Sequence, residues 1–371
     1  MNAPRFANQQ STAFDAVARW LKNGTDDQKV FRLFGYAGTG KTSIARHIVD
    51  LVDGKVVYAA PTGKAALRMR LAGCPDATTI HSLVCTPRSR PDGQMRFVIN
   101  PRSSVSDAAL VVVDEALMVD LELGQKLKSF KVPILALGDP AQLFPVNGPS
   151  IFGIGAPDVM LTQVHRQAAG NPVLELATMA REGRLIPSGT YGTSRVLRLA
   201  ELADHELLDF DQIIVATNRM RFSINERCRI ALGRRSTMPE AGDKLLSEEN
   251  DPDRGLYNGG LHHVLAIGAE DSRKRALRMT LSSLDYPGHP SVEVAAAIEF
   301  LVNPQAKSGK KQGGVHRMSY GYAITAHKAQ GSEWRRILVI DEHRCFAEDR
   351  NRWLYTALTR ASESVVLARL E

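Results

Sequence analysis

Short apolar runs recur along the chain, and segments with the mixed pattern of surface helices lie between them. A strand that is buried on both faces is apolar throughout, so these runs predict parallel sheets in an α/β protein. The first four runs predict one sheet and the last three predict a second. The runs are VFRLF (30–34), KVVYAA (55–60), ALVVVD (109–114), ILALGD (134–139), QIIVAT (212–217), ILVID (337–341) and SVVLARL (364–370).

Two segments interrupt this rhythm. Residues 86–104 contain a Pro-Asp-Gly turn at Pro91–Gly93 next to a strand-like run, which predicts an inserted β-hairpin. Residues 240–314 contain three apolar runs separated by Gly, Pro and Asp, and end in the basic loop KSGKKQGG (307–314). We predict a first core over 1–150, a second core over 151–239 and 315–371, and a small β-rich accessory insertion over 240–314.

The net charge of the chain is +7, which is compatible with a polyanionic partner but is shared by many proteins. The four cysteines are scattered without a CxxC pair, which argues against a zinc site or a disulfide framework. The first residues lack the pattern of a signal peptide, and no apolar stretch is long enough to span a bilayer. These features predict a soluble protein in the cytoplasm, or in the host cytoplasm if a phage encodes it.

A phosphate-binding loop is indicated by GYAGTGKT (35–42), which fits G-x-x-x-x-G-K-[ST] between a strand-like run and a helix-like one. Its backbone N–H groups are expected to bind phosphate oxygens, with Lys41 on the β- and γ-phosphates and the Thr42 hydroxyl on Mg²⁺. The alternative is a glycine-rich turn without a ligand. The predicted ATP-binding residues of this segment are Gly35, Gly38, Thr39, Gly40, Lys41, Thr42 and Ser43.

Carboxylates follow two of the apolar runs. Asp114 suits the Mg²⁺ shell, and Glu115 suits a base that orients the attacking water. In ILALGDPAQLFPV (134–146), the amide of Gln142 can hydrogen-bond both a γ-phosphate oxygen and a water. For the segment that contains Gln142, an ordinary Gly-Asp-Pro turn without a role in the site is the open alternative.

The order of the motifs resembles that of superfamily 1 helicases, most closely the RecD/Dda-like, 5′-to-3′ branch. This resemblance implies two RecA-like cores with ATP between them and single-stranded DNA across the top. It also implies an enzyme, a nucleic-acid-stimulated ATP hydrolase of replication, repair or recombination. The motifs are GYAGTGKT, AAPTGKAA (59–66), TTIHSL (78–83), VVVDEA (111–116), LGDPAQLFPV (137–146), LTQVHRQ (161–167), ITAHKAQGSEW (324–334) and LYTALTRA (354–361).

The resemblance assigns further residues to the nucleotide. Arg166 and Arg360 would be arginine fingers from the second core, with surface positions or backbone-phosphate contacts as the alternatives. Gly331 and Glu333 would face the nucleotide, with Glu333 on the ribose. Gln10 resembles a glutamine that reads adenine, although the neighbouring glutamine leaves the register open.

Other residues are assigned to DNA by the same resemblance. Pro61, Thr62, Thr325 and His327 would contact phosphate, and His81 would stack on a base or bind phosphate. Phe97, in the hairpin that takes the place of a strand-separating pin, is either a wedge or a buried side chain. The accessory insertion corresponds to an SH3-like domain of the family.

The pattern departs from the family at two positions. Leu117 follows the DEA motif, where a small polar residue is common, and Phe144 stands where a proline is usual. The favoured prediction is a monomeric DNA helicase acting on single strands and junctions with ATP and Mg²⁺, alongside a single-strand-binding protein or replication proteins. The alternatives are an RNA helicase or nucleoprotein remodeller, a P-loop enzyme for a small molecule or protein switch, and an inactive nucleic-acid-binding module.

Overall fold

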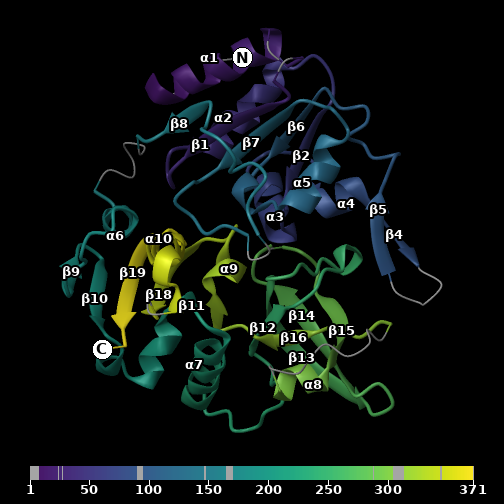
Figure 1. Ribbon diagram of the computed structural model, residues 1–371. Helices are drawn as coiled ribbons and strands as arrows, with labels where there is room; N and C mark the ends of the chain where they lie inside the picture. Colours follow the sequence, from purple (N-terminus) through teal and green to yellow (C-terminus); the bar gives the residue numbers. More distant parts are fainter. Residues whose placement is uncertain are drawn as a thin grey trace. The chain divides into compact units, whose positions relative to one another are not determined.

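The computed structural model divides into two compact units, Met1–Gly170 and Asn171–Glu371 (Figure 1). No helix in the described part of the chain is both long and apolar enough to cross a lipid bilayer. The structure describes residues 8–23, 25–26, 28–89, 95–145, 148–163, 170–286, 288–303, 313–342 and 345–370.

The sheet of the first unit has the strand order β3-β2-β6-β7-β1-β8, and all its pairs are parallel. The first four apolar runs form β2, β6, β7 and β1 of this sheet, as predicted. The strands are β1 (Val30–Gly35), β2 (Val56–Ala60), β3 (Thr78–Thr79), β6 (Leu110–Val113), β7 (Ile134–Gly138) and β8 (Val159–Leu161).

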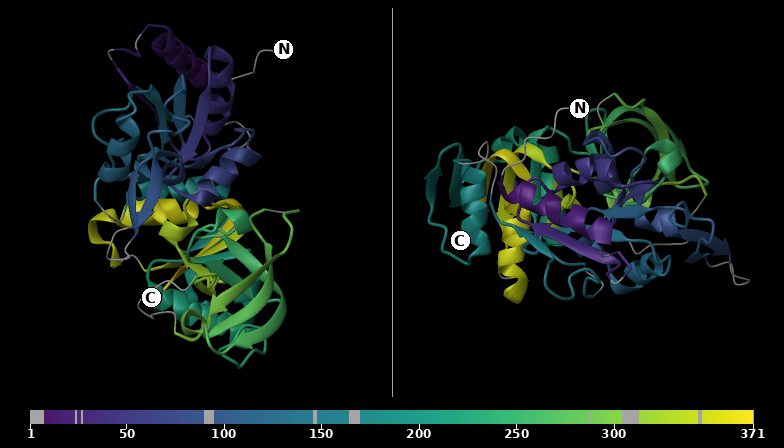
Figure 2. Two further views of the ribbon diagram at one scale, coloured as in Figure 1. Left: turned by 90° about the vertical axis from the view of Figure 1, so that its right-hand side faces the viewer. Right: turned by 90° about the horizontal axis from the view of Figure 1, so that it is seen from above.

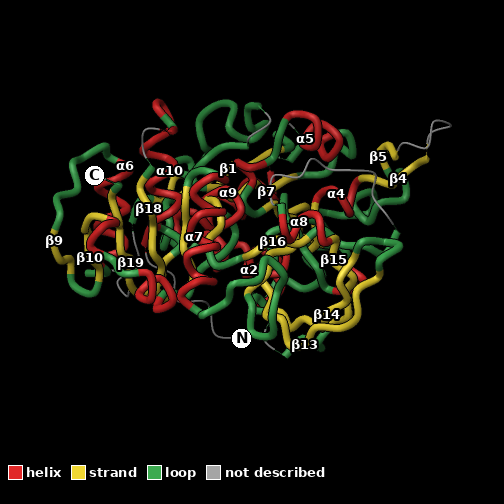
Figure 3. Tube along the Cα trace, turned by 90° about the horizontal axis from the view of Figure 1, so that it is seen from below, coloured by secondary structure: helices red, strands yellow, loops and turns green. Residues whose placement is uncertain are grey.

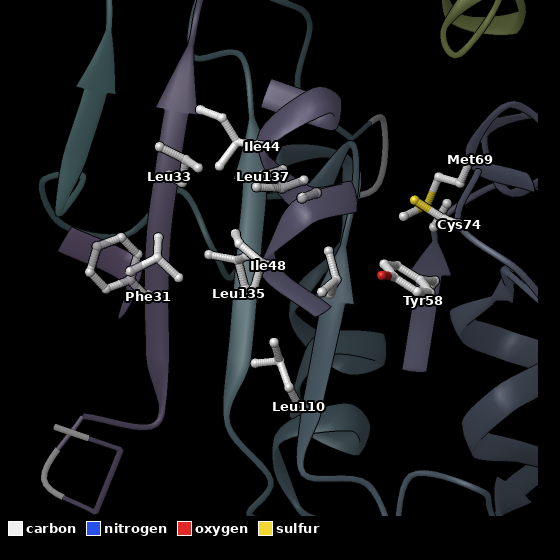
Figure 4. Close-up of a cluster of buried hydrophobic side chains, with 14 of the residues drawn as sticks. Phe31, Leu33, Ile44, Ile48, Tyr58, Met69, Cys74, Leu110, Leu135 and Leu137 are labelled. Carbon is white, nitrogen blue, oxygen red and sulfur yellow. The ribbon is translucent and has the colours of Figure 1, made fainter. Parts of the chain in front are cut away.

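Both faces of this sheet are buried, which explains why its strands are apolar without alternation. Along β7, Leu135 and Leu137 enter one hydrophobic cluster, and Ile134 and Ala136 enter the other. In the first cluster, the α2 side chains Ile44 and Ile48 lie over the strands (Figure 4). The helices of this unit are α1 (Asn8–Asn23), α2 (Lys41–Ile48), η1 (Val49–Leu51), α3 (Gly63–Leu71), α4 (Ile80–Val84), η2 (Ala116–Met118) and α5 (Leu121–Lys128).

The predicted hairpin is present as β4 (Cys85–Ser89) and β5 (Met95–Ile99), which pair antiparallel from Cys85↔Ile99 to Ser89↔Met95. Its predicted turn at Pro91–Gly93 lies outside the described residues. The first unit extends beyond the predicted boundary at residue 150, because β8 pairs with β1 and completes the first sheet.

The second unit contains a sheet with the order β17-β11-β18-β19-β10-β9, parallel except for the β9–β10 pair. The last three predicted runs form β11, β18 and β19 of this sheet. The strands are β9 (Gly189–Tyr191), β10 (Ser194–Arg198), β11 (Gln212–Val215), β17 (Ala323–Thr325), β18 (Trp334–Asp341) and β19 (Ala361–Arg369). The helices are α6 (Pro172–Arg181), η4 (Leu199–Glu201), η5 (Asp204–Asp209), α7 (Asn218–Ala231), α9 (Ala326–Ala329), η8 (Ala347–Asp349) and α10 (Arg350–Leu358).

The accessory segment forms a separate antiparallel sheet in the order β15-β14-β13-β12-β16, with its own hydrophobic cluster. The long strands β13 and β14 run side by side (Figure 3), and the sheet curves strongly (Figure 2). Two register shifts between these strands are consistent with that curvature. The elements are β12 (Lys244–Ser247), η6 (Pro252–Arg254), β13 (Leu261–Asp271), β14 (Ala276–Ser283), β15 (Val292–Ala297), α8 (Ile298–Val302) and β16 (Met318–Tyr320).

The β-rich character of this segment therefore agrees with the sequence, but its predicted end at residue 314 is too early. The edge strand β16 pairs with β12 and belongs to the accessory sheet. Most of the predicted basic loop 307–314 lies outside the described residues. An SH3-like arrangement of these strands stays a prediction.

Candidate nucleotide and nucleic-acid sites

The phosphate loop connects β1 to α2 and depends on glycine at several positions. Gly38 and Gly40 have φ angles of 75° and 81°, in the left-handed region that favours glycine. At Gly35 the constraint is space, because a Cβ there would come 2.7 Å from the Leu161 Cβ. Since the N-cap residue of α2 is Gly40, the cap position has no side chain that could accept from the first N–H groups of the helix. This arrangement provides backbone donors for an anion.

Lys41 is the first residue of α2, and its ammonium lies across the loop. Nζ donates to the Gly35 carbonyl at 2.7 Å and to the Tyr36 carbonyl at 3.1 Å. The Thr39 hydroxyl donates to the same Tyr36 carbonyl at 2.8 Å. The lysine is therefore held within the loop by acceptors that it can exchange for phosphate oxygens.

Asp114 follows β6 and faces the start of α2. The Thr42 hydroxyl lies 3.3 Å from Asp114 Oδ2, and Asp114 Oδ1 accepts from the Glu115 N–H at 2.9 Å. Mg²⁺ usually takes one or two protein oxygens and keeps waters or phosphate oxygens in its other positions, so this pair fits the ion. Among the described residues, no group of three or more His, Cys, Asp and Glu is placed to hold a metal.

Glu115 adopts a left-handed backbone conformation, with φ 48° and ψ 38°. Such a conformation costs about 1–3 kcal/mol for a residue with a side chain, and it persists only where the surroundings enforce it. Here the Asp114 carboxylate binds the Glu115 N–H, and η2 begins directly afterwards. The two adjacent carboxylates are thereby fixed at the end of one buried strand.

The Gly-Asp-Pro turn after β7 and the predicted Gln142 form one arrangement. Asp139 is buried, and its carboxylate accepts from the Ala141 N–H at 3.0 Å and from Gln142 Nε2 at 3.4 Å. The turn and the amide are thus not exclusive alternatives, because the turn positions the amide. Leu117 packs against Gly138, where an added Cβ would come 2.8 Å from the leucine Cγ. Phe144 is 36% exposed.

The two neighbouring glutamines of α1 have different surroundings. Gln10 is buried, and its Nε2 donates to the Thr39 carbonyl of the phosphate loop at 2.9 Å. Gln9 accepts from the Thr162 and Gln163 N–H groups at 2.9 and 2.8 Å, and so connects α1 to the end of β8. Of the two, Gln10 contacts the phosphate loop; its role with adenine stays a prediction.

Several predicted DNA contacts lie near the ends of β2 and β3. Pro61 directly follows β2, and Thr62 caps α3 by accepting from the Ala65 N–H at 3.2 Å. His81 lies on α4 and meets Phe97 of β5, with ring centroids 5.8 Å apart at 77°. Phe97 is 51% exposed, so the alternative in which it is buried under the hairpin is wrong.

In the second unit, Arg360 lies beside the Gly331–Glu333 segment. The buried guanidinium donates to the carbonyls of Ser332 at 3.2 Å and Thr356 at 3.0 Å, and to the Thr359 hydroxyl at 3.1 Å. Glu333 itself is exposed. Three of the predicted nucleotide-facing residues are thus brought together. Arg166 lies outside the described residues.

Thr325 ends β17 and His327 lies in α9, both half-buried. The imidazole is 6.2 Å from the Phe346 ring, which stacks on Trp353 at 5.9 Å. Burial lowers the pKa of His327 below 6.5, and Asp349 opposes that shift.

Sequence reasoning did not single out a cluster of charges next to His327. Lys328 Nζ donates to Glu248, which follows β12, and Glu248 Oε1 also accepts from Arg221 at 3.1 Å and from the Ser319 hydroxyl at 2.7 Å. Although burial opposes it, pairing with Lys328 holds the pKa of Glu248 below its usual value. Lys328 stands in the quoted motif ITAHKAQGSEW, but its partner comes from a distant segment that carries no motif.

Comparison with known protein families adds to this geometry. Residues 6–200, more than half of the chain, match the model of the AAA domain, and residues 320–368 match the UvrD-like helicase C-terminal domain. The chain belongs to the AAA domain family. The AAA match spans the phosphate loop and both carboxylates, and the helicase match spans α9 and Arg360.

Among curated relatives, the ATP-dependent RecD2 DNA helicase of Deinococcus radiodurans is 30% identical over 366 aligned residues, covering 89% of this chain and 46% of that protein. The ATP-dependent DNA helicase dda of Enterobacteria phage T4 is 28% identical over 193 residues, covering 47% of this chain and 42% of that one. The chain thus spans about half the length of these two curated relatives. The resemblance to superfamily 1 helicases of the RecD/Dda-like branch is confirmed.

A solved structure of the Pif1 helicase from Bacteroides in complex with ADP-AlF3 and ssDNA is similar in fold. Its TM-score is 0.61 at 18% identity, and the match covers 98% of this chain and 92% of that one. A Pif1 helicase from Candida albicans gives a TM-score of 0.59, also at 18% identity. The predicted fold class, α/β with two RecA-like units, is confirmed at this level.

Proposed function

We propose that the chain is an ATP-dependent DNA helicase motor that moves on single-stranded DNA, in the 5′-to-3′ direction. The observation that carries the proposal is the contact between Arg360 and the Ser332 carbonyl. It joins an arginine suited to a transferring phosphoryl group to the segment that begins at Thr325 and His327. One short stretch then links the predicted nucleotide and DNA contacts.

The first unit supports the nucleotide half of the proposal. Its loop, with Lys41 across it and a glycine at the N-cap of α2, suits the β- and γ-phosphates of ATP. Thr42 and Asp114 would hold Mg²⁺, which would bridge phosphate oxygens and neutralise their charge. Glu115 and Gln142 would orient the attacking water, and Gln10, Gly331 and Glu333 would contact the nucleoside.

The DNA half rests on exposed or half-buried residues near strand ends. Pro61, Thr62, Thr325 and His327 would contact backbone phosphates, while His81 and Phe97 would offer stacking surfaces to bases. Single strands and their junctions with duplexes would be the substrate. We further propose that the motor works as a monomer beside a single-strand-binding protein, in the cytoplasm, where such a substrate occurs.

DNA-stimulated ATP turnover tests this proposal. Lys41→Ala and Glu115→Gln should each abolish turnover, because one removes a phosphate ligand and the other removes the base. Lys128→Ala, which removes an exposed lysine of α5, should leave turnover unchanged. Normal turnover in Lys41→Ala or in Glu115→Gln would contradict the assigned roles.

Two further comparisons define the substrate and the direction. Matched DNA and RNA oligonucleotides should differ in ATPase stimulation, and stronger stimulation by RNA would favour the RNA helicase alternative. Duplexes with a 5′ single-stranded tail should be unwound, whereas those with a 3′ tail should not. Equal unwinding of both would contradict the 5′-to-3′ direction.

A further inference from the structure

A cavity of about 280 Å³ lies within the second unit, between the start of α7, the helix α9 and the β16 edge of the accessory sheet. Helices α7 and α9 adjoin the parallel sheet of the second unit, whereas β16 belongs to the accessory sheet (Figure 1). We call it the α7–α9 cavity. It is lined by Asn218, Arg221, Glu248, Phe300, Arg317, Ser319 and Lys328.

The cations of this cavity outnumber its anions. Arg221, Arg317 and Lys328 line it with positive charge, against the single carboxylate of Glu248. The Arg317 guanidinium lies 3.7 Å from Glu249 Oε2, measured from its Nε, and 5.7 Å from the centroid of the Phe300 ring. A concave surface with an excess of one charge attracts counter-ions of the opposite sign.

Arg221 is the most deeply placed of the three cations, at 4% exposure. Its Nη1 donates to both Glu248 and Ser319, and among the described residues its Nε has no hydrogen-bond partner. A buried guanidinium normally has its donors satisfied, because leaving them unpaired costs free energy. Its planar donors also match the geometry of phosphate oxygens.

Glu248 occupies the position that an external anion would take. It accepts from Arg221, Ser319 and Lys328 together, which is the donor set that a phosphate group would need. The cavity also has room for a further group, because its volume of about 280 Å³ is several times the roughly 30 Å³ that one water molecule takes in the liquid. Arg317, only partly buried, lines the same space.

We propose that the α7–α9 cavity binds a backbone phosphate of the nucleic-acid strand, and that Glu248 competes with this phosphate for Arg221 and Lys328. The inference rests on the proposed function, because it concerns the strand on which the motor moves. Lys328 directly follows His327, so the cavity extends the predicted phosphate contacts from α9 to the accessory sheet. Glu248 then weakens the grip of the second unit when it holds both cations.

The alternative is that the cluster is structural, with Glu248 serving only to join the accessory sheet to α7 and α9. The two interpretations differ in what the loss of the Glu248 charge does. A structural carboxylate leaves binding unchanged or weaker when it is neutralised. A competing carboxylate gives tighter binding, because two cations become available to the strand.

Equilibrium binding of a fluorescent oligo-dT strand, measured by anisotropy over a range of salt concentrations, tests the inference. For single strands the slope of log K against log salt falls by about 0.7 for each phosphate contact that is lost. Arg317→Gln should lower the slope by about that amount. Arg273→Gln, which removes an exposed arginine of the turn between β13 and β14 outside the cavity, should keep the slope of the unaltered chain.

Glu248→Gln is the opposing variant, since it keeps the shape of the side chain and its acceptor for Arg221 and Ser319. It should bind the strand several-fold more tightly than the unaltered chain at the same salt concentration. Equal slopes for Arg317→Gln and Arg273→Gln, or unchanged or weaker binding by a folded Glu248→Gln, would overturn the inference. Far-ultraviolet circular dichroism and the thermal midpoint establish that each variant is folded.

A competition experiment shows whether the cavity binds a phosphate of the DNA strand or a free phosphate ion. Inorganic phosphate is added in place of chloride at constant ionic strength. If the cavity takes the strand, phosphate should displace DNA from the unaltered chain more strongly than from Arg317→Gln. Displacement by phosphate combined with an unchanged slope in Arg317→Gln would identify a free-anion site and overturn the assignment to the strand. Failure of the unaltered chain to bind any strand would instead contradict the proposed function itself.

Discussion

The rings of His81 and Phe97 meet edge to face, with centroids 5.8 Å apart and planes at 77°. His81 comes from α4 and Phe97 from the paired strand β5 of the inserted hairpin, so the contact joins the hairpin to the body of the first unit. The Phe97 side chain is nevertheless 51% exposed. The contact therefore holds the Phe97 ring against the first unit while about half of the side chain stays exposed.

Phe97→Ala should weaken binding to single-stranded DNA. Stacking of a base on an aromatic ring contributes about 1–3 kcal/mol, which corresponds to roughly fivefold to 150-fold in Kd. Ile99→Ala is the matched control, because Ile99 is also exposed, at 44%, on the same strand. Fluorescence anisotropy with a labelled single strand measures both variants. Equal affinities of the two would show that Phe97 does not stack on the strand.

Thr42→Ala should raise the Mg²⁺ concentration needed for half-maximal ATP hydrolysis, since the variant removes one of the two side-chain oxygens that we propose would hold the ion. Thr42→Ser keeps the hydroxyl next to Asp114 Oδ2 and should require about the same concentration as the unaltered chain. A Mg²⁺ titration of the ATPase rate compares the three proteins. An unchanged requirement in Thr42→Ala would remove Thr42 from the metal shell.

Arg360→Lys should slow ATP hydrolysis by about 10³–10⁵, the range for an arginine that stabilises the transferring phosphoryl group. Lysine keeps the charge, but it loses the planar donors that bind Ser332, Thr356 and Thr359. Single-turnover hydrolysis and nucleotide affinity should be measured together. Loss of affinity and rate in equal proportion would indicate that Arg360 only supports the local fold.

The sheets could be predicted from the sequence because their strands are buried on both faces. Ile134 and Leu135 enter opposite clusters, so the run is apolar at every position and is easily recognised. In the first sheet, the strands that were missed are short: β3 spans Thr78–Thr79 and β8 spans Val159–Leu161. They pair at the edges of the sheet, and their place depends on neighbours that are distant in the sequence.

In the candidate site, too, some parts could be predicted from the sequence and others could not. Its local parts, such as the loop from Gly35 to Thr42, could be predicted because their spacing determines their conformation. Contacts between distant segments could not. Glu248 lies 80 positions from Lys328 and carries no motif, so only the pairing of β12 with β16 brings it into the cluster. The burial of Arg360 against Ser332 is a second example, because an arginine in LYTALTRA could equally be exposed.

The pH dependence of stability should report the burial of His327. Because burial lowers its pKa below 6.5 in the folded chain, the unfolded chain binds a proton at higher pH than the folded chain does. The stability that the neutral His327 contributes to the folded chain is fully present above pH 6.5 and is lost as the pH falls below 6.5. The thermal midpoint should therefore fall between pH 7.5 and 5.5, and less steeply in His327→Gln. Equal slopes in the unaltered chain and in His327→Gln would contradict this contribution of His327.

Asp243 should be the most costly single acidic residue to remove from the second unit. It is fully buried, and its carboxylate pairs with Arg229 and Arg234 and accepts from the Tyr322 hydroxyl at 2.7 Å. Burial raises the pKa of Tyr322, and the hydrogen bond to Asp243 raises it further, so the phenol keeps the proton that it donates.

Removing one partner of a buried ion pair leaves the other charge without compensation and costs about 3–5 kcal/mol. Asp243→Ala should therefore lower the free energy of unfolding by about that amount. Asp253→Ala, at an exposed position of the accessory segment, should change it by less than about 0.5 kcal/mol. Chemical denaturation monitored by tryptophan fluorescence measures both. A loss below about 1 kcal/mol in Asp243→Ala would mean that Arg229 and Arg234 find other partners, such as the Met238 and Ala241 carbonyls that they already contact.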